Sequence, residues 1–428
     1  MSLAYFWILV FLMAAGAPVV FALLLAPGLS LALDGRPEFF STLLVRLYSG
    51  IDSFPLMAVP FFVLAGEIMN AGGITRRIVD FAGTLIGHFR GGLAHVNILS
   101  SLMFSGLSGS AVADASAVGK MLIPVMEANG YTRRFAAAVT AASAVIGPII
   151  PPSGIMILYA FVMGVPVAAL FAGGVLPGLL ICLALMAVTA LLARRLNLPR
   201  AGAKAGWNER GAAFAKAIPA LLTPAILLGG IWFGVFTPTE AAAVAVAYAL
   251  IVSLFVTRTL RLSDLPGVLQ SAAIQSGVIL FLVGAAVTFA WIITVSGLGG
   301  AVGDSFGALS DNVFVLLFLV NLFLFLIGMV LDVGPAILIL APVLAPIFTN
   351  LGVDPVHFGI IMCINLSIGL ATPPMGLVLF VAAGLSGERT ERIALAMLPY
   401  LAAQIGIIFL ITFVPEIPLF LPRLLGLL

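Results

Sequence analysis

Long apolar runs dominate the chain and predict membrane-spanning helices. Such runs lie at residues 5–33, 54–69, 179–193 and 395–414, near or above the roughly 20 residues that a helix needs to cross a hydrocarbon core. Unpaired backbone groups are costly in lipid, so spanning segments are helices or closed barrels. The pattern predicts an all-α polytopic membrane protein. The first run lacks a basic n-region and a cleavage site, so we expect a retained first helix and no cleaved signal peptide.

Composition narrows the function further. The chain is 62% hydrophobic and 8% charged, whereas soluble domains carry about a quarter charged residues. The net charge of +2 is spread along the chain, which argues against nucleic acid as a partner. Cys182 and Cys363 lie in apolar runs and are expected to be reduced core thiols. Common hydrolase and ATPase motifs do not occur, so we expect no enzyme.

Glycine and proline positions repeat along the chain. A shift of 222 positions (328 − 106) superimposes seven of them without a gap. Paired helix-breaking segments in two halves are a sequence indicator of a transporter binding site, and the shift therefore predicts two related halves. The superimposed positions are Gly106 and Gly328, Pro124 and Pro346, Gly130 and Gly352, Gly147 and Gly369, Pro151 and Pro373, Pro152 and Pro374, and Gly154 and Gly376.

The repeat gives a map of two inverted-topology repeats and a connecting helix. Apolar segments broken by Ser and Gly have arms of about 13 residues, which at about 1.5 Å per residue reach only about 20 Å. We therefore expect re-entrant hairpins and, between the halves, one added span near residues 217–236. The map has a first repeat at 1–210 (hairpin about 96–127, broken helix about 131–165), a connecting transmembrane helix at 211–235, and a second repeat at 236–428 (hairpin about 313–350, broken helix about 356–384).

Basic residues give the expected orientation. Clusters around Arg133, Arg194 and Lys204 share one side of the map, which the positive-inside rule makes cytoplasmic. The map then places fifteen Lys or Arg residues inside and three outside, with the N-terminus cytoplasmic and the C-terminus external. Residues 74–89 are too short and too charged to span and predict a surface helix, and residues 299–309 are the expected counterpart on the other side.

Two proline-rich runs in equivalent places can carry chemistry. Residues 147–153 and 369–374 each contain a Pro-Pro pair, and proline frees the carbonyl four residues earlier. Freed carbonyls beside hydroxyls can bind a sodium ion, although either run alone could be a simple kink. Each run is expected to face a glycine-rich hairpin tip. An acid at membrane depth is a candidate functional residue, which singles out Asp332 and, as candidates for coupling, Asp114 and Glu67.

Four segments then carry a resemblance to a known family. Residues 108–114, 147–153, 236–241 and 372–376 resemble the large membrane subunit of the tripartite ATP-independent periplasmic (TRAP) transporters, of the DctM type. The resemblance extends over nearly the whole chain. It implies a sodium-driven importer in the bacterial inner membrane for organic acids such as C4-dicarboxylates or sugar acids. It also implies a separate small four-helix subunit, a periplasmic substrate-binding protein, and a transport domain that moves against a scaffold as an elevator.

The resemblance also implies the site residues. Two or more sodium ions are expected, one between each hairpin tip and the facing proline run, with the substrate between the tips. The implied sodium ligands are Ser105, Ser108, Gly109, Gly147, Ile150 and Pro151 in the first half, and Gly328, Asp332, Gly369, Ala371 and Thr372 in the second. The implied substrate-binding residues are Ser108, Ser110, Ser153 and Asp332.

Other functions remain open at this point. A self-sufficient sodium/dicarboxylate symporter or an anion exchanger could share the same design, and it would transport without a binding protein. A gated channel could also use re-entrant loops, but its ion currents would far exceed the turnover of a carrier. An intramembrane enzyme lacks a nucleophile and base at one depth, and a purely structural scaffold does not explain paired broken helices.

Overall fold

The computed structural model describes residues 4–200, 204–298, 300, 302, 310, 312–373 and 376–428. The described residues form helices and turns with one isolated bridge between Arg90 and Arg200, so the all-helical prediction is confirmed for them. Seven of the described helices are long and apolar enough to cross a membrane. The expected surface helix at 299–309 lies outside the described residues, apart from positions 300 and 302.

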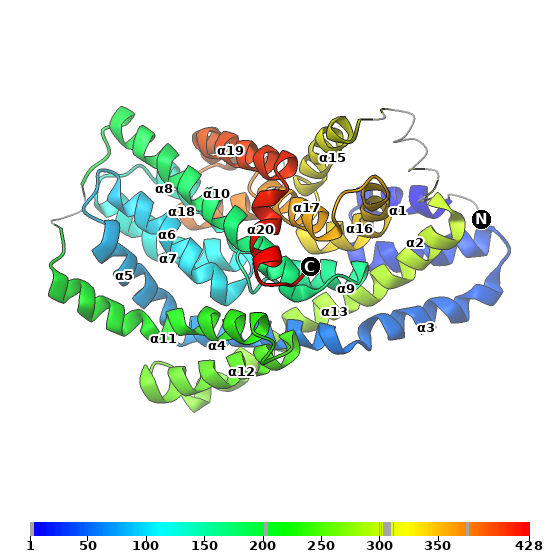
Figure 1. The fold of residues 1–428 in the computed structure, drawn as a ribbon, viewed down its shortest axis with the longest axis horizontal. Helices are drawn as coiled ribbons and strands as arrows, with labels where there is room; N and C mark the ends of the chain where they lie inside the picture. The colour runs from blue at the N-terminus through cyan, green and yellow to red at the C-terminus, as the bar shows by residue number, and fades with distance from the viewer. Residues whose placement is uncertain are drawn as a thin grey trace.

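The N-terminal half contains ten α-helices among the described residues; in Figure 1 the chain runs from α1 to α3 at one end to α5 to α8 at the other, and α9 returns toward the middle. They are α1 (Ala4–Ala14), α2 (Val19–Leu33), α3 (Phe40–Ile51), α4 (Ala58–Ala71), α5 (Ile74–Ile86), α6 (Gly92–Ser108), α7 (Ala111–Ala128), α8 (Arg133–Ala144), α9 (Gly154–Met163) and α10 (Val167–Arg195).

The second half continues with the long helices α11 and α13, with α12 between them, and a second helical hairpin. Its elements in the described part are α11 (Trp207–Trp232), α12 (Pro238–Ile251), α13 (Leu265–Ser296), α15 (Val313–Gly328), α16 (Val333–Asn350), α17 (Pro355–Gly369), α18 (Leu377–Ser386), α19 (Thr390–Phe413) and α20 (Glu416–Leu424). Helix α12 begins with a capping box, in which Thr237 N donates to Glu240 at 2.8 Å and Glu240 N donates to Thr237 Oγ1 at 3.3 Å.

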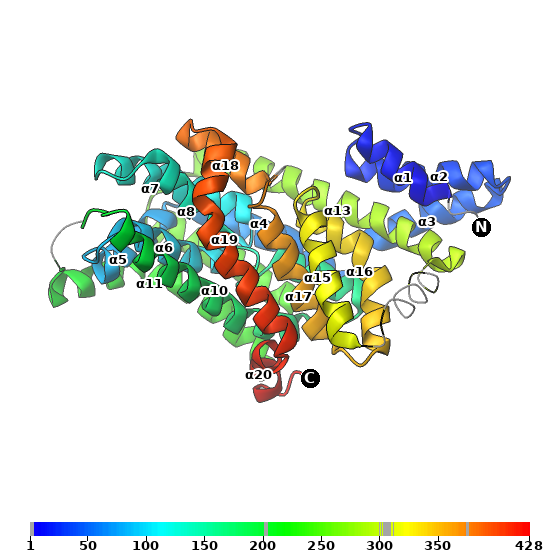
Figure 2. The ribbon, with the colours of Figure 1, turned by 90° about the horizontal axis from the view of Figure 1, so that it is seen from above.

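Two groups of helices make up the molecule. Helix α13 packs against α2, α3 and α4, and α4 packs against α12. The second group contains the two hairpins: the α6 and α7 pair lies toward one end, the α15 and α16 pair toward the other, and α10, α17 and α19 lie between them in both views (Figures 1 and 2). Both hairpins therefore belong to the second group. The first group contacts it where α13 packs against α16.

Helix bounds recur at the 222-residue spacing seen in the sequence. Helix α7 starts at Ala111 and α16 at Val333, and the two have the same length of 18 residues. Helices α8 and α17 start at 133 and 355. Helix α9 packs on the second hairpin through α16, and α18 packs on the first through α7. The corresponding elements thus make corresponding contacts.

Three helix predictions differ from the structure. Residues 5–33 form two helices rather than one, because the chain turns at Gly16 (φ +83°) and Pro18 stands before α2. The hairpin arms have 17 and 18 residues instead of about 13, because α6 continues through the Ser- and Gly-rich tip. The connecting helix α11 begins at Trp207, about ten residues earlier than expected.

The helices end where prolines remove backbone donors. The first interruption, residues 145–153, separates α8 from α9, and the second, residues 370–376, separates α17 from α18. Proline has no N–H group and cannot continue the helical bonding pattern. Each interruption follows a helix whose residues are almost all buried. Both interruptions therefore lie in the interior of the second group of helices.

Candidate functional site

The tip of the first hairpin touches the first interruption directly. Gly109 lies between α6 and α7 with φ +59°, and a Cβ atom built there would lie 2.7 Å from the Pro152 carbonyl oxygen. A Cβ on Gly147 would lie 3.0 Å from the Ser110 carbonyl oxygen. Glycine is needed at both positions, because any side chain would push the two backbones apart. The structure thus brings together Gly109, Ser110 and Gly147 from the predicted set.

The first interruption leaves carbonyl groups unpaired. The carbonyls of Gly147, Ile150 and Pro151 accept no backbone hydrogen bond from the residues that the structure describes. The Pro148 carbonyl is satisfied differently, since Ser153 Oγ donates to it at 2.5 Å. Unpaired oxygen dipoles in a buried segment are suitable ligands for a hard cation. The donor set at this position fits a sodium ion.

The serines of the first site serve helix ends as well. Ser105 Oγ donates to the Leu102 carbonyl at 2.6 Å. Ser110 and Ser153 are the N-caps of α7 and α9, and each hydroxyl accepts a backbone N–H at 3.4 Å. Both hydroxyls therefore have a structural role at a helix start. Ser108 ends α6, and its side chain lies outside the described part of the structure.

The second hairpin meets the second interruption through two glycines. A Cβ on Gly369 would lie 2.4 Å from the Gly328 carbonyl carbon, which places backbone against backbone. Thr372 Oγ1 donates to the Ile368 carbonyl at 2.9 Å, and Ala371 is fully buried. Pro374 lies outside the described residues. The second predicted pair of segments is therefore also in contact, at Gly328 and Gly369.

Asp332 occupies the start of α16. Its Oδ1 accepts a hydrogen bond from Val333 N at 2.8 Å, and its side chain is exposed. Among the described contacts, none joins Asp332 to the second interruption. An N-cap aspartate stabilises a helix without any ligand, so the geometry gives Asp332 a structural role and leaves its carboxylate accessible for another.

The two coupling candidates have different surroundings. Asp114 is fully buried on the first turn of α7, and its carboxylate oxygens accept no hydrogen bond of normal length from the described residues. The Ser101 hydroxyl lies beside this carboxyl but is directed to Ser143 Oγ at 3.1 Å. Glu67 instead accepts a hydrogen bond from Gln275 at 2.9 Å, which joins α4 to α13. Only Asp114 therefore lies in the helices of the first hairpin.

A buried polar cluster near the first hairpin was not predicted. Asn97 Nδ2 donates to Thr140 Oγ1 at 2.7 Å, and Ser143 Oγ donates to Asn97 Oδ1 at 3.0 Å. These residues tie α6 to α8 and are at most 1% exposed. The sequence signal was an asparagine inside an apolar run. Asn321 gives the same signal in the second half, where Asn365 Nδ2 donates to its Oδ1 at 2.7 Å.

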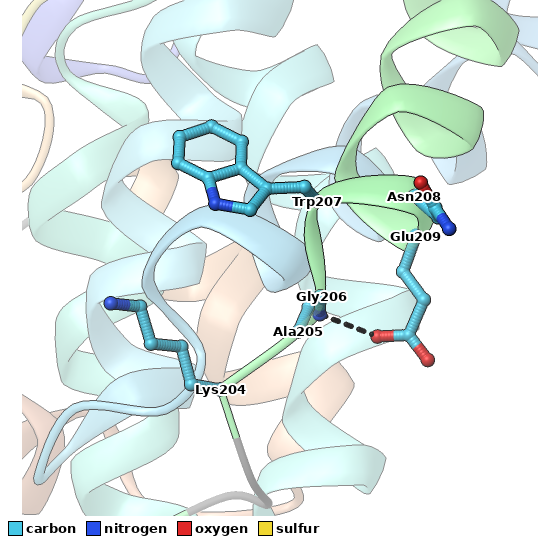
Figure 3. A pocket seen from close by; sticks show the side chains of 6 residues that line it. All are labelled: Lys204, Ala205, Gly206, Trp207, Asn208 and Glu209. Carbon is cyan, nitrogen blue, oxygen red and sulfur yellow. Dashed lines mark hydrogen bonds between the residues drawn. The ribbon is translucent and has the colours of Figure 1, made fainter.

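Two surface cavities lie away from the hairpin tips. One of about 630 Å³ lies at the start of α11, where Glu209 accepts a hydrogen bond from Gly206 N (Figure 3). Another of about 290 Å³ is apolar and lies between α2, α3 and α13. Neither of these two cavities contains a predicted site residue.

The comparisons with known proteins agree with the predicted class. Residues 6–417 match the family described as tripartite ATP-independent periplasmic transporter, DctM component. A sialic acid TRAP transporter large permease protein of Vibrio cholerae is 39% identical over 416 residues, 96% of each chain. A C4-dicarboxylate TRAP transporter large permease protein of Rhodobacter capsulatus is 35% identical over 439 residues, 99% of each chain.

A solved structure shares the fold. The YdaH transporter of Alcanivorax borkumensis superimposes with a TM-score of 0.63 over 89% of this chain and 88% of its own. The sequence identity is 18%. At that identity the likeness concerns the fold alone, and it supports the arrangement of the helices rather than any residue role.

Proposed function

This chain belongs to the family of TRAP transporter DctM components, and we propose that it is the large membrane subunit of a sodium-coupled importer of organic acids. Its relatives are transporter permeases and not enzymes. The seven long apolar helices among its described residues indicate a multi-pass membrane protein. The finer features below are proposals that rest on the contacts between the hairpin tips and the interruptions.

The sodium proposal is carried by the first interruption. Three carbonyl groups without described backbone partners lie in a segment that touches the tip of the first hairpin at Gly109 and Ser110. We place one sodium ion here, with ligands from Ser105, Ser108, Gly109, Gly147, Ile150 and Pro151. A second ion lies at the second interruption, with ligands from Gly328, Asp332, Gly369, Ala371 and Thr372.

The substrate proposal follows from charge. The two relatives named above carry sialic acid and C4-dicarboxylates in their names, and we extend the class, an organic acid, to this chain. An anion is costly to desolvate in a membrane, and bound cations offset its charge. We place the substrate between the tips, near Ser108, Ser110, Ser153 and Asp332. Asp114 and Glu67 are kept as candidates for coupling.

The mechanism proposal is an elevator built on two inverted repeats. The recurrence of helix bounds at a 222-residue spacing, with corresponding contacts of α9 and α18, supports the repeats. The hairpins, interruptions and α19 form the moving transport domain, and the helices around α13 form the scaffold. The binding site can then face the two sides of the membrane in turn.

We propose the partners and the membrane location from the membership of the family. A small four-helix subunit, encoded as a separate chain, and a periplasmic binding protein complete the transporter. The location is the bacterial inner membrane, with the N-terminus cytoplasmic and the C-terminus periplasmic, because the basic residues then lie mainly inside. A stand-alone sodium/dicarboxylate symporter or anion exchanger is the alternative.

Reconstitution tests the proposal. The chain and the small subunit are placed in proteoliposomes with the binding protein outside, and uptake of radiolabelled succinate and sialic acid is measured with an inward sodium gradient or with choline. We expect uptake of one acid that needs both sodium and the binding protein. Uptake that needs no binding protein would favour the alternative.

A substitution localises the second ion site. We expect Asp332→Ala to abolish sodium-dependent uptake, because it removes the accessible carboxylate of the second tip, while co-purification with the small subunit stays unchanged. The same sodium dependence in Asp332→Ala as in the wild type would remove Asp332 from the site.

A further inference from the structure

A glutamine from the second half holds the end of a helix in the first half. Gln404 on α19 is fully buried, and its Nε2 donates to the Ala142 carbonyl of α8 at 2.8 Å. The two residues are 262 positions apart in the chain. The contact therefore links two segments that the 222-residue spacing assigns to different halves.

The Ala142 carbonyl needs a partner because α8 ends there. In a continuing helix Ile146 N would donate to it, but Ile146 N donates to the Ser143 carbonyl at 3.0 Å instead. The last carbonyls of any helix lack intrahelical partners, and a buried carbonyl without one is costly. The side-chain amide of Gln404 supplies the missing donor.

The orientation of the Gln404 amide is fixed by this contact. Only the Nε2 end can donate to a carbonyl oxygen, and the Oε1 end is buried without a hydrogen bond from the described residues. Among the described residues, the Gln404 amide makes no other side-chain hydrogen bond. The side chain thus acts on the end of α8.

The end of α8 leads straight into the first interruption. Ala142 lies five positions before Gly147, where a built Cβ atom would lie 3.0 Å from the Ser110 carbonyl oxygen at the hairpin tip. A shift of the last turn of α8 would move the Gly147 carbonyl and the segment that follows it. Because Gly147 is closely packed against the Ser110 backbone, the structure cannot absorb such a shift.

The second interruption is held in another way. Asn365, in the last turns of α17, pairs with Asn321 of the same half at 2.7 Å. The residue 222 positions before Gln404 is Cys182, which is a free thiol and a weak donor. The link through a glutamine therefore belongs to the first interruption.

We propose that Gln404 is a positioning residue for the cation site at the first interruption, acting across the two halves through the Ala142 carbonyl. This inference rests on the proposed sodium coupling. Gln404 does not bind the ion. It sets the carbonyl geometry that the ion meets, and it makes that geometry depend on the placement of α19.

The test separates sodium affinity from transport rate. Gln404→Leu keeps most of the side-chain volume and removes the hydrogen-bond donor. The sodium concentration for half-maximal uptake should rise about tenfold, which is the effect of a lost buried hydrogen bond. The maximal rate should stay within about twofold of the wild type. Tyr400→Phe is the matched control. It lies one turn earlier on α19 and loses a buried hydrogen bond to Thr189 at 3.0 Å, and its half-maximal sodium concentration should not change.

A second variant gives a signature that a packing defect lacks. In Gln404→Glu only the protonated carboxyl can donate to the Ala142 carbonyl, so the sodium affinity, relative to wild type at each pH, should recover as the pH is lowered. An unchanged half-maximal sodium concentration in Gln404→Leu, or a fall in maximal rate alone, would overturn the inference. A wild type without any sodium dependence would instead refute the proposed function itself.

Discussion

The contact between Gly328 and Gly369 can be tested by one methyl group. In Gly369→Ala the new Cβ would lie 2.4 Å from the Gly328 carbonyl carbon, 2.6 Å from its Cα and 2.7 Å from its oxygen. Ordinary contacts begin at 3.4 Å, so the two segments must separate by about 1 Å (3.4 − 2.4). Both partners are backbone, and no side chain can rotate away. The tip of the second hairpin must then leave the second interruption.

The expected cost follows from known overpacking effects. Forcing an extra carbon into a packed interior costs about 1–3 kcal/mol. If this strain falls on the ion-binding geometry, it weakens sodium binding by roughly 5- to 150-fold, since about 1.4 kcal/mol corresponds to a factor of ten. Alanine has a higher helix propensity than glycine, so the substitution itself favours the end of α17. A loss of affinity therefore reports the clash.

The assay compares two alanine variants in proteoliposomes. Gly406→Ala on α19 is the matched control, because a Cβ there has no atom within 4 Å. The half-maximal sodium concentration for uptake should rise at least fivefold in Gly369→Ala and stay unchanged in Gly406→Ala. Equal values in the two variants would refute the argument that this backbone contact shapes the second site.

Two further substitutions distinguish site residues from structural ones. Ser153→Ala removes the N-cap of α9 and the 2.5 Å hydrogen bond to the Pro148 carbonyl. It should lower the free energy of unfolding by about 1–2 kcal/mol and weaken sodium-dependent uptake. Normal uptake would remove Ser153 from the site. Thr237→Ala removes the N-cap of α12 and should lower the melting temperature, because the free energy of unfolding falls by about 1 kcal/mol. The half-maximal sodium concentration should stay as in the wild type. A changed value would contradict a purely structural cap.

Local backbone chemistry explains what the sequence could predict. Proline lacks an N–H group wherever it stands, so the Pro-Pro pairs indicated where α8 and α17 would end without any knowledge of their neighbours. Gly109, Gly147, Gly328 and Gly369 were predicted as site residues, and the close backbone approach at these glycines became visible only in the structure. The 222-residue spacing then identified the equivalent segments of the two halves.

Two errors in helix bounds arose from local signals. The Ser- and Gly-rich tip was expected to break the first hairpin early, yet Ser105 donates to the Leu102 carbonyl and the helix continues to Ser108. The run at 5–33 was expected to be one helix although Gly16 and Pro18 mark a turn. That signal was present in the sequence and was missed.

Contacts between distant segments could not be predicted. The bond from Gln404 to Ala142 depends on α19 packing against α8, and nothing in the residues around either position indicates that pairing. The same holds for the cluster of Asn97, Thr140 and Ser143. A polar side chain in an apolar run predicts a buried partner, but the fold is needed to identify it.

The central claim is that the two interruptions, held against the hairpin tips, bind sodium. The melting temperature of the purified chain in sodium chloride and in choline chloride at equal ionic strength tests it without any substrate. A ligand that binds only the folded state stabilises it by about 2.7 kcal/mol at one hundred times its Kd. We predict a melting temperature that rises with sodium and not with choline, and a smaller rise in Gly369→Ala. Identical melting in the two salts at every concentration would contradict the account.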